Sequence, residues 1–318
     1  MEKLVCIVGP TASGKTALSI ALAREFSGEI VSADSMQIYR QMDIGTAKPD
    51  KTEQAGIPHH MLDIIDPSEE YSAARYASEA AAAVADIRSR GHLPIVAGGT
   101  GYYVNALLGR ISFEPEPDNA EVRARLTAEA EALGEQVLYD RLTALDPVYA
   151  ATVHPNNVKR VIRALEIIEL SGNTVTSRAE RLHAAPLRYA PVLIGICPES
   201  RELLVRRIEQ RVDAMLAAGL LEEARRLHTQ YGDRLSQTAR QAIGYKELFS
   251  YFDGNCTLEE AREAIRIHTR QYSKRQMTWF RQDAAIRWIT YPENVNFGLI
   301  LEKARDILRE NGIIENRV

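Results

Sequence analysis

The chain has 318 residues, of which 45% are hydrophobic and 26% charged, and its formal net charge is −4. This composition is typical of a soluble globular protein, and the length allows one large domain with a smaller one. No apolar run approaches the ~20 residues of a membrane span, so we expect no membrane association. The three cysteines Cys6, Cys197 and Cys256 are too scattered for a disulfide framework or a metal site, which favours a reducing cytoplasmic location.

Short apolar runs predict β-strands at residues 4–8, 29–32, 61–65, 93–97, 192–196 and 286–290. Helical periodicity falls between them and predicts helices at 15–26, 72–90, 101–108, 119–132, 135–144, 157–170, 200–228, 239–251, 257–282 and 298–311. Alternating helices and short strands rich in Val and Ile are typical of a doubly wound parallel sheet. We therefore predict an α/β fold.

The stretch between the fourth and fifth predicted strands contains only helical patterns. It opens with E-P-E-P-D at 114–118 and closes with Y-A-P at 189–191, both of which are typical of hinges. We therefore expect residues 113–190 to form an all-helical insertion domain. Residues 1–112 and 191–318 would form the two parts of the core, the second with basic C-terminal helices.

The most specific signal is G-P-T-A-S-G-K-T at 9–16, between the first strand and the first helix. It matches the phosphate-binding P-loop, in which glycines let successive N–H groups point into one concavity. The lysine adds a positive charge, and the threonine hydroxyl can hold Mg²⁺. The motif predicts a P-loop-type core with Mg²⁺ at Thr16 and a diphosphate or triphosphate bound by Gly9, Pro10, Thr11, Ala12, Ser13, Gly14, Lys15 and Thr16.

The other strand ends differ from those of an ordinary P-loop hydrolase, which places an acid after an apolar strand. The 93–97 strand runs into G-G-T-G-Y-Y at 98–103, a second glycine-rich turn with the hydroxyl of Thr100 and no acid. The acid is Asp34, after the second strand. Strand ends at one edge of a parallel sheet converge, so Asp34, Thr100 and the P-loop should surround one cleft. Alternatively, Asp34 caps a helix with Gln37 completing a capping-box-like pattern, and the glycines only make a tight turn.

A diphosphate cradle beside an aspartate suits a reaction in which diphosphate is the leaving group. An acceptor nitrogen or hydroxyl would lose its proton to Asp34 while a carbon atom departs from its diphosphate. Mg²⁺, Lys15 and backbone N–H groups would stabilise the charge that builds on the diphosphate.

Nine segments, in the same order and across almost the whole chain, resemble the tRNA dimethylallyltransferase (isopentenyltransferase) family. Without the Cys/His zinc module of some eukaryotic relatives, the resemblance is to the bacterial type. The segments are G-P-T-A-S-G-K-T at 9–16, S-A-D-S-M-Q-I-Y-R at 32–40, D-I-G-T-A-K-P at 43–49, G-I-P-H-H-M-L-D-I at 56–64, G-G-T-G-Y-Y at 98–103, H-P-N-N-V-K-R-V-I-R-A-L-E at 154–166, R-V-D-A-M-L-A-A-G-L at 211–220, Q-A-I-G-Y-K-E at 241–247 and T-R-Q-Y-S-K-R-Q-M-T-W-F-R at 269–281.

The resemblance implies transfer of a dimethylallyl group from dimethylallyl diphosphate to N6 of adenosine 37, in the anticodon stem–loop of tRNA. It implies that Asp34 accepts the N6 proton, that Gln37 lies beside the base and that Thr100 faces the reaction centre. The expected catalytic set is Asp34, Thr100, Lys15 and Arg211, of which Arg211 would contact the diphosphate. A helix-surface ion pair is the alternative for Arg211. We expect a monomer whose tRNA contacts are Asp34, Ser35, Met36, Gln37, Thr100, Arg123, Asn157, Val158, Lys159, Arg160, Val161, Arg240, Gly244 and Tyr245.

Charge also favours a nucleic-acid partner. Residues 1–150 carry 13 Lys and Arg against 22 Asp and Glu, whereas residues 151–318 carry 26 against 21, and 22 of those 26 are Arg. Arg266, Arg270, Lys274 and Arg281 recur on one face of a helix, which we interpret as a phosphate-contacting surface; a solvated face is the alternative.

Three other functions remain open on the sequence. A free adenine nucleotide could be the acceptor, but it would not need the helical insertion or the arginine-rich second half. A P-loop small-molecule kinase would share the cradle but lacks the strand-end acid. A non-catalytic RNA-binding module would leave Asp34 and Thr100 without a joint role. We interpret His59 and His60 as structural, since adjacent histidines do not face one metal ion from a regular element.

Overall fold

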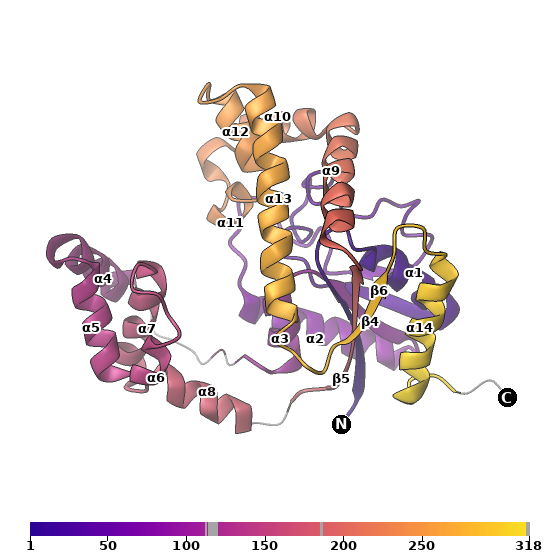
Figure 1. Cartoon of the computed structure of the whole chain (residues 1–318), viewed down its shortest axis with the longest axis horizontal. Coiled ribbons are helices and arrows are strands. Elements are labelled where there is room, and N and C mark those ends of the chain that lie inside the picture. The colour runs from indigo at the N-terminus through magenta and orange to yellow at the C-terminus, as the bar shows by residue number, and fades with distance from the viewer. Residues whose placement is uncertain (112, 114–119, 185–186, 316–318) are drawn as a thin grey trace. The chain divides into compact units, whose positions relative to one another are not determined.

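The computed structural model describes residues 1–111, 113, 120–184 and 187–315, and the expected hinge at 114–118 lies outside them. The chain divides into two compact units, Met1–Leu108 with Arg188–Val318, and Gly109–Leu187. Figure 1 shows the first unit as an α/β body and the second as a group of helices.

The first unit is built on a six-stranded sheet in the order β3-β2-β4-β1-β5-β6. Every neighbouring pair of strands is parallel. The predicted doubly wound α/β fold is therefore confirmed. The strands are β1 Lys3–Val8, β2 Gly28–Ser32, β3 His59–His60, β4 Leu93–Gly98, β5 Ala190–Pro198 and β6 Arg287–Tyr291.

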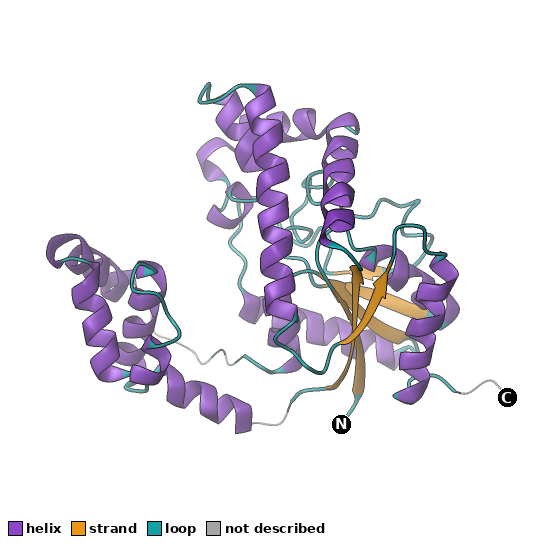
Figure 2. Cartoon of the chain, viewed as in Figure 1, coloured by secondary structure: helices purple, strands orange, loops and turns teal. Residues whose placement is uncertain are grey.

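Side chains alternate between the two faces of the sheet, as the pleat of a strand requires. In β1, Val5 and Ile7 pack in one core with the inner faces of α1 and α14, whereas Leu4, Cys6 and Val8 enter a second and larger core. Both faces are covered, which is why the strands read as nearly continuous apolar runs. Figure 2 shows helices around the orange strands.

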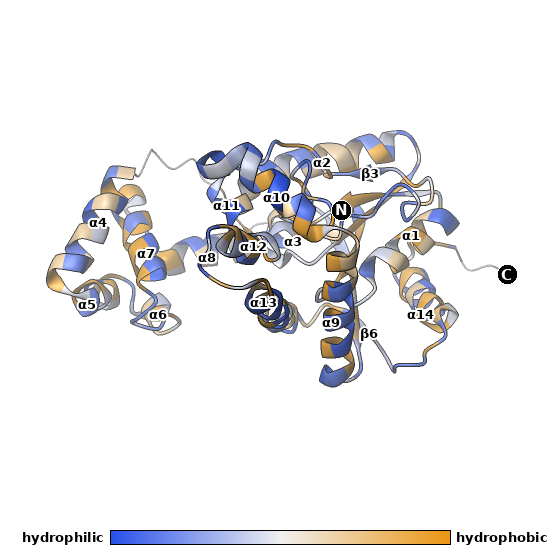
Figure 3. Ribbon diagram, turned by 90° about the horizontal axis from the view of Figure 1, so that it is seen from above, coloured by the Kyte–Doolittle hydropathy of each residue, from blue (hydrophilic) through white to orange (hydrophobic). Residues whose placement is uncertain are grey.

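The helices of this unit are α1 Lys15–Glu25, α2 Ala73–Ser89, α3 Gly101–Leu108, α9 Arg201–Ala217, α10 Leu220–Tyr231, α11 Gln237–Arg240, α12 Tyr245–Phe252, α13 Leu258–Phe280 and α14 Phe297–Glu310, with a 3₁₀ turn at Gly232–Arg234. Figure 3 shows α13 as mainly hydrophilic. Arg266 and Arg270 on α13 form ion pairs with Asp213 at 2.6 Å and Glu209 at 2.7 Å on α9. Two arginines of the expected phosphate-contacting face thus join α13 to α9.

The second unit contains α4 Ala120–Leu133, α5 Glu135–Leu145, α6 Pro147–Ala150, α7 Val158–Ser171 and α8 Val175–Ala184. Its own apolar core is formed by Leu126, Leu138, Leu142 and Leu165 with smaller neighbours. Asp146 begins α6 and accepts hydrogen bonds from both the N–H and the hydroxyl of Thr176 in α8. The short helices α6 and α8 were not predicted.

Three predicted elements were wrong in place or length. The helix predicted at 239–251 is two helices, α11 Gln237–Arg240 and α12 Tyr245–Phe252, separated by residues 241–244. The third strand is His59–His60 and not 61–65, because Met61 (φ 63°) and Asp63 (φ 55°) adopt left-handed conformations that no strand allows. The helix predicted at 200–228 is two helices, separated at Gly219, whose φ of 103° ends one and begins the other.

Candidate active site

Three strand ends form the floor of a cavity of about 310 Å³ in the first unit. The P-loop follows β1, the turn of Gly98 and Gly99 ends β4, and Asp34 follows β2; these three strands are neighbours in the sheet. Residues of α9 and α13, the turn at 45–47 and the segment from 241 to 246 complete the walls. Residues that line the cavity are Thr11, Lys15, Thr16, Asp34, Ser35, Met36, Gln37, Gly45, Thr46, Ala47, Ala97, Gly98, Gly99, Arg211, Val212, Met215, Gln241, Ala242, Ile243, Gly244, Lys246, Ile265, Thr269, Tyr272, Arg275 and Gln276.

The P-loop has the backbone that its sequence predicts. Gly9 has φ 150°, and a Cβ there would lie 2.3 Å from the carbonyl oxygen of Ile196. Gly14 and Ala12 also have positive φ, at 92° and 62°. Lys15 begins α1, and its ammonium group donates to the carbonyl of Pro10 at 2.7 Å across the loop. The loop is therefore curled around its lysine, as in a phosphate cradle.

Two side chains hold the outer side of the P-loop. Arg207 of α9 donates through Nε to the carbonyl of Ala12 at 2.8 Å, and the hydroxyl of Tyr291 in β6 donates to the carbonyl of Ser13 at 2.8 Å. The carbonyls of Ala12 and Ser13 are thus each bound by a side-chain donor from another element, which fixes the backbone of the loop.

The cavity carries an excess of positive charge around Lys15. Burial, and after it the positive charge of Arg211, lower the pKa of Lys15 from its ordinary value of 10.5 to about 7, although the charge of Asp34 acts in the opposite direction. Burial likewise lowers the pKa of Arg211. Two cations that face the same buried space favour an anionic ligand, because its charge would offset both.

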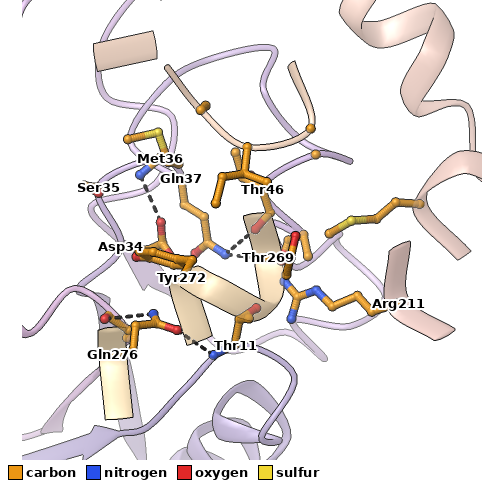
Figure 4. A pocket seen from close by; sticks show the side chains of 18 of the residues that line it. Thr11, Asp34, Ser35, Met36, Gln37, Thr46, Arg211, Thr269, Tyr272 and Gln276 are labelled. Carbon is orange, nitrogen blue, oxygen red and sulfur yellow. Dashed lines mark hydrogen bonds between the residues drawn. The ribbon is translucent and has the colours of Figure 1, made fainter. Parts of the chain in front are cut away.

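Asp34 lies in a turn and not at the start of a helix. Its Oδ1 accepts a hydrogen bond from the N–H of Met36 at 2.9 Å, and residues 35–38 form turns. Gln37 does not complete a capping box, because its amide donates to the carbonyls of Thr46 and Ala47, both at 3.2 Å. The helix-cap alternative for Asp34 was therefore wrong, and its carboxylate lies at the cavity wall (Figure 4).

Thr100 supports this wall from the start of α3. Its hydroxyl accepts a hydrogen bond from the N–H of Ser35 at 3.1 Å and lies 3.4 Å from the Ser35 hydroxyl. Thr100 thus holds the turn that follows Asp34. Tyr272 contacts Thr100 from α13, and burial, strengthened by the negative charge of Asp34, raises the pKa of Tyr272 to about 12.

Sequence reasoning missed one wall of the cavity, which α13 provides. Gln276 bridges the two glycine turns, since its Oε1 accepts from the N–H of Thr11 at 2.8 Å and its Nε2 donates to the carbonyl of Gly99 at 2.9 Å (Figure 4). Thr269 and Tyr272 lie on the same face of α13. Their spacing of three and four residues is helical, and this polar stripe beside the basic one was the signal available in the sequence.

The expected tRNA contacts fall in three places. Asp34, Ser35, Met36 and Gln37 line the cavity, as does Gly244. Arg240 donates to the carbonyl of Gly232 at 2.8 Å and pairs with Asp233 at 3.1 Å. Tyr245 is fully buried and its hydroxyl donates to Glu223, and its contact with tRNA stays a prediction.

The remaining expected contacts lie in the helical unit. Asn157, Lys159 and Arg160 are exposed at the start of α7, and Val158 is half-buried. Val161 is buried in the unit's core, and its contact with tRNA likewise stays a prediction. Arg123 binds the fully buried carboxylate of Glu166 at 2.8 Å.

His59 and His60 form the short strand β3 at the edge of the sheet. Nε2 of His60 lies 2.7 Å from the carboxylate of Glu29 in β2, which Arg90 also binds. Among the residues that the structure describes, no group of three His, Cys, Asp or Glu could hold a metal ion. The contact of His60 with Glu29 joins β3 to β2.

Comparison with known proteins agrees with this geometry. The model of the IPP transferase family matches residues 37–283. The chain belongs to the IPP transferase family. Among curated IPP transferases, it is 48% identical over 287 residues to a tRNA dimethylallyltransferase of Halalkalibacterium halodurans, covering 90% of each chain. It is 47% identical over 302 residues to one of Geobacillus thermodenitrificans, covering 95% of each chain.

Solved structures of IPP transferases have the same fold. The tRNA isopentenylpyrophosphate transferase of Bacillus halodurans aligns with a TM-score of 0.73 at 44% identity, over 98% of this chain and 96% of that one. A eukaryotic dimethylallyltransferase acting on tRNA aligns with a TM-score of 0.81 at 32% identity, over 100% of this chain and 81% of that one. No described helix is long and apolar enough to cross a bilayer.

Proposed function

We propose that the protein transfers a dimethylallyl group from dimethylallyl diphosphate to N6 of adenosine 37, next to the anticodon of tRNA, and releases diphosphate. The observation that carries this proposal is a P-loop that shares one cavity with Asp34 and with two half-buried cations, Lys15 and Arg211. Relatives that match most of the chain are named tRNA dimethylallyltransferase, which supports the same reaction.

The P-loop would hold the diphosphate of the prenyl donor. Backbone N–H groups at the start of α1 point toward anions, and the helix dipole favours negative charge there. Lys15 and Arg211 line the same cavity, so both would bind the diphosphate oxygens. Charge on these oxygens grows as the C–O bond to the prenyl carbon breaks, and the fixed cations stabilise it in place.

Asp34 would act as the general base. The bond between N6 and the prenyl carbon forms while the C–O bond breaks, and the electron pair of the C–O bond leaves with the diphosphate. The attacking N6 carries a proton that it must lose, and Asp34 accepts it. Thr100, through the N–H of Ser35, holds the turn next to this carboxylate.

The residues fit a Mg²⁺ ion. Thr16 lines the cavity beside Lys15 and offers a hydroxyl oxygen, a hard donor that Mg²⁺ prefers. Mg²⁺ takes few protein ligands and completes its shell with phosphate oxygens and water. When bound, the ion would supply further neutralisation of the diphosphate leaving group.

We further propose that the protein binds the anticodon stem–loop of tRNA and that the target base is unstacked into the cavity. The exocyclic amine of a base that stays stacked in the RNA would not reach the reacting groups. The exposed residues of α7, Asn157, Lys159 and Arg160, would contact the RNA from the helical unit. We propose that the protein acts as a monomer.

One assay tests the reaction. The protein is incubated with dimethylallyl diphosphate, Mg²⁺ and unmodified tRNA, and the digested nucleosides are analysed by mass. Prenylated adenosine from tRNA but not from AMP is the expected result. Product from AMP would instead favour a free-nucleotide prenyltransferase, and phosphoryl transfer from ATP to an acceptor would favour a kinase.

A further inference from the structure

The D-I-G-T-A-K-P segment forms a tight turn at the edge of the cavity. Ala47 donates to the carbonyl of Ile44 at 2.9 Å, and the hydroxyl of Thr46 donates to the carbonyl of Met42 at 2.7 Å. Gly45, Thr46 and Ala47 line the cavity. We call residues 43–47 the wall turn, and its shape decides what this part of the cavity offers to a ligand.

A buried carboxylate holds the wall turn from behind. Glu223 of α10 is 2% exposed. It accepts hydrogen bonds from three successive backbone N–H groups, at 3.1 Å from Asp43, 3.0 Å from Ile44 and 3.1 Å from Gly45. Successive N–H groups that converge in this way form an anion-binding nest, and here the protein fills the nest itself.

Tyr245 completes the arrangement from α12. Its hydroxyl donates to Glu223 at 2.6 Å, and a Cβ on Gly45 would lie 2.5 Å from its ring. The wall turn is therefore held both by hydrogen bonds to the carboxylate and by close packing of Gly45 on the tyrosine ring.

The front of the wall turn faces Gln37. Nε2 of Gln37 donates to the carbonyls of Thr46 and Ala47, both at 3.2 Å, while its Oε1 accepts from the hydroxyl of Ser32 at 3.2 Å. The positions of the two carbonyls thus fix which way the amide of Gln37 points. Figure 4 shows this contact between Gln37 and Thr46 at the cavity wall.

We propose that Glu223 is a positioning residue for the RNA substrate, which acts through the wall turn and the amide of Gln37. It sets the surface that meets the target base and leaves the diphosphate cradle unaffected. The role of Gln37 at the base rests on the proposed function. The orientation of Gln37 by Glu223 rests on the contacts alone.

Glutamine cannot replace Glu223 in this position. An ionised carboxylate offers two acceptor oxygens, which match the three N–H groups and the one hydroxyl. The amide of glutamine has one acceptor oxygen, and its NH₂ group would face donors. Glu223→Gln should therefore leave buried N–H groups without an acceptor and shift the wall turn.

A double-mutant cycle tests the proposal. In prenyl transfer at saturating dimethylallyl diphosphate, Glu223→Gln should raise the KM for tRNA on the order of tenfold, with a smaller effect on kcat. In a Gln37→Ala background the same change should alter the KM for tRNA by less than about threefold, because Glu223 can no longer act through the amide of Gln37. The affinity for inorganic diphosphate, measured by calorimetry, should be unchanged.

Two further variants separate positioning from general damage. Glu222→Gln removes the same charge one residue away at an exposed site, and it should leave the KM for tRNA unchanged. If Glu223→Gln fails to fold, Tyr245→Phe removes only the hydroxyl that donates to Glu223, and it should raise the KM for tRNA in the same selective way. Equal effects of Glu223→Gln in both backgrounds, or an equal loss of diphosphate binding, would overturn the proposal.

A spectroscopic measurement keeps the test independent of the proposed reaction. The side-chain amide signal of Gln37 in a ¹H–¹⁵N spectrum is identified by its loss in Gln37→Ala. It should shift in Glu223→Gln but not in Glu222→Gln. An unshifted signal would reject the inference even if wild-type protein modifies tRNA. A shifted signal with no transfer to tRNA would reject only the proposed function.

Discussion

Lys15 is the residue whose chemistry depends most on the cavity. In the free protein, burial and the neighbouring charge of Arg211 lower its pKa to about 7, so it is partly neutral near neutral pH. A bound diphosphate would add negative charge beside the ammonium group and raise this pKa again. Binding of the anion and binding of a proton at Lys15 are therefore coupled.

This coupling predicts a pH dependence of diphosphate binding. Below the pKa of about 7 the free protein already carries the proton on Lys15, so binding takes up none. Above it the proton must be acquired, and the affinity should fall by up to about tenfold per pH unit. Calorimetry in buffers of different ionisation enthalpy counts the protons taken up. Lys15→Gln is the control for titration of the diphosphate itself, and the same uptake in both proteins would contradict the assignment.

Asp34 gives a second prediction at this scale. Asp34→Asn keeps an oxygen that can accept from the N–H of Met36, so the turn should survive. It removes the group that takes the N6 proton, and turnover on tRNA should fall by roughly 10²–10⁴-fold. Diphosphate affinity and the unfolding midpoint should change little. Single-turnover transfer measures the effect, and a rate close to that of wild type would leave Asp34 a structural role only.

Among the elements, α13 shows most clearly what can be predicted from the sequence and what cannot. Its length and amphipathic pattern predicted the helix, and Arg266 and Arg270 drew attention to the basic face. Those arginines pair with carboxylates of α9. The neighbouring face of α13, with Tyr272 and Gln276, lines the cavity. The hydrogen-bond partners of Gln276 are Thr11 and Gly99, which lie far away in the sequence. No local pattern shows which of two polar faces docks on a loop more than two hundred residues away.

The bridge made by Gln276 yields a prediction for the element. Gln276→Leu removes the acceptor for the Thr11 N–H and the donor for the Gly99 carbonyl, both in a buried place. The free energy of unfolding should fall by about 1–3 kcal/mol, and diphosphate binding should weaken because the two glycine turns are no longer joined. Denaturant unfolding and calorimetry measure the two effects.

The control for Gln276 is Lys274→Ala, an exposed site on the same helix, which should change stability by less than about 0.5 kcal/mol. Equal stability of Gln276→Leu and Lys274→Ala would show that the bridge contributes nothing to the fold.

The ends of strands and helices were predicted closely where a local feature of the sequence determines them. The strands beside the P-loop were predicted closely because Val and Ile runs, glycines and parallel packing agree. The failure at 61–65 has a tertiary cause, since Lys48 pairs with Asp63 at 2.5 Å and Ile64 and Ile65 donate to the carbonyl of Ile38. An apolar run that reads as a strand is bent there into a loop.

At the scale of the whole molecule, bulk charge does not favour the proposed binding of RNA by the helical unit. Residues 109–187 carry nine Lys and Arg against twelve Asp and Glu. Several of these arginines are engaged, since Arg123 binds Glu166 and both Arg125 and Arg141 bind Glu169. Any attraction for RNA must therefore be local. Lys159 and Arg160 lie in the first turn of α7, where the helix dipole adds to their positive potential.

The last prediction concerns Lys159 at the start of α7. If it contacts a phosphate of tRNA, Lys159→Glu should weaken binding and reduce the slope of log affinity against log salt by about 1. Lys303→Glu makes the same change in net charge on α14, a helix that packs on the other side of the sheet from the larger core, and should leave the slope unchanged. Filter binding or fluorescence anisotropy over a salt series gives both slopes.

Diphosphate affinity should be the same in both variants, because the cradle and the α7 site bind different parts of the substrates. Equal slopes for the two variants would mean that α7 does not touch the RNA backbone, and the acidic character of this unit would then keep tRNA away from it.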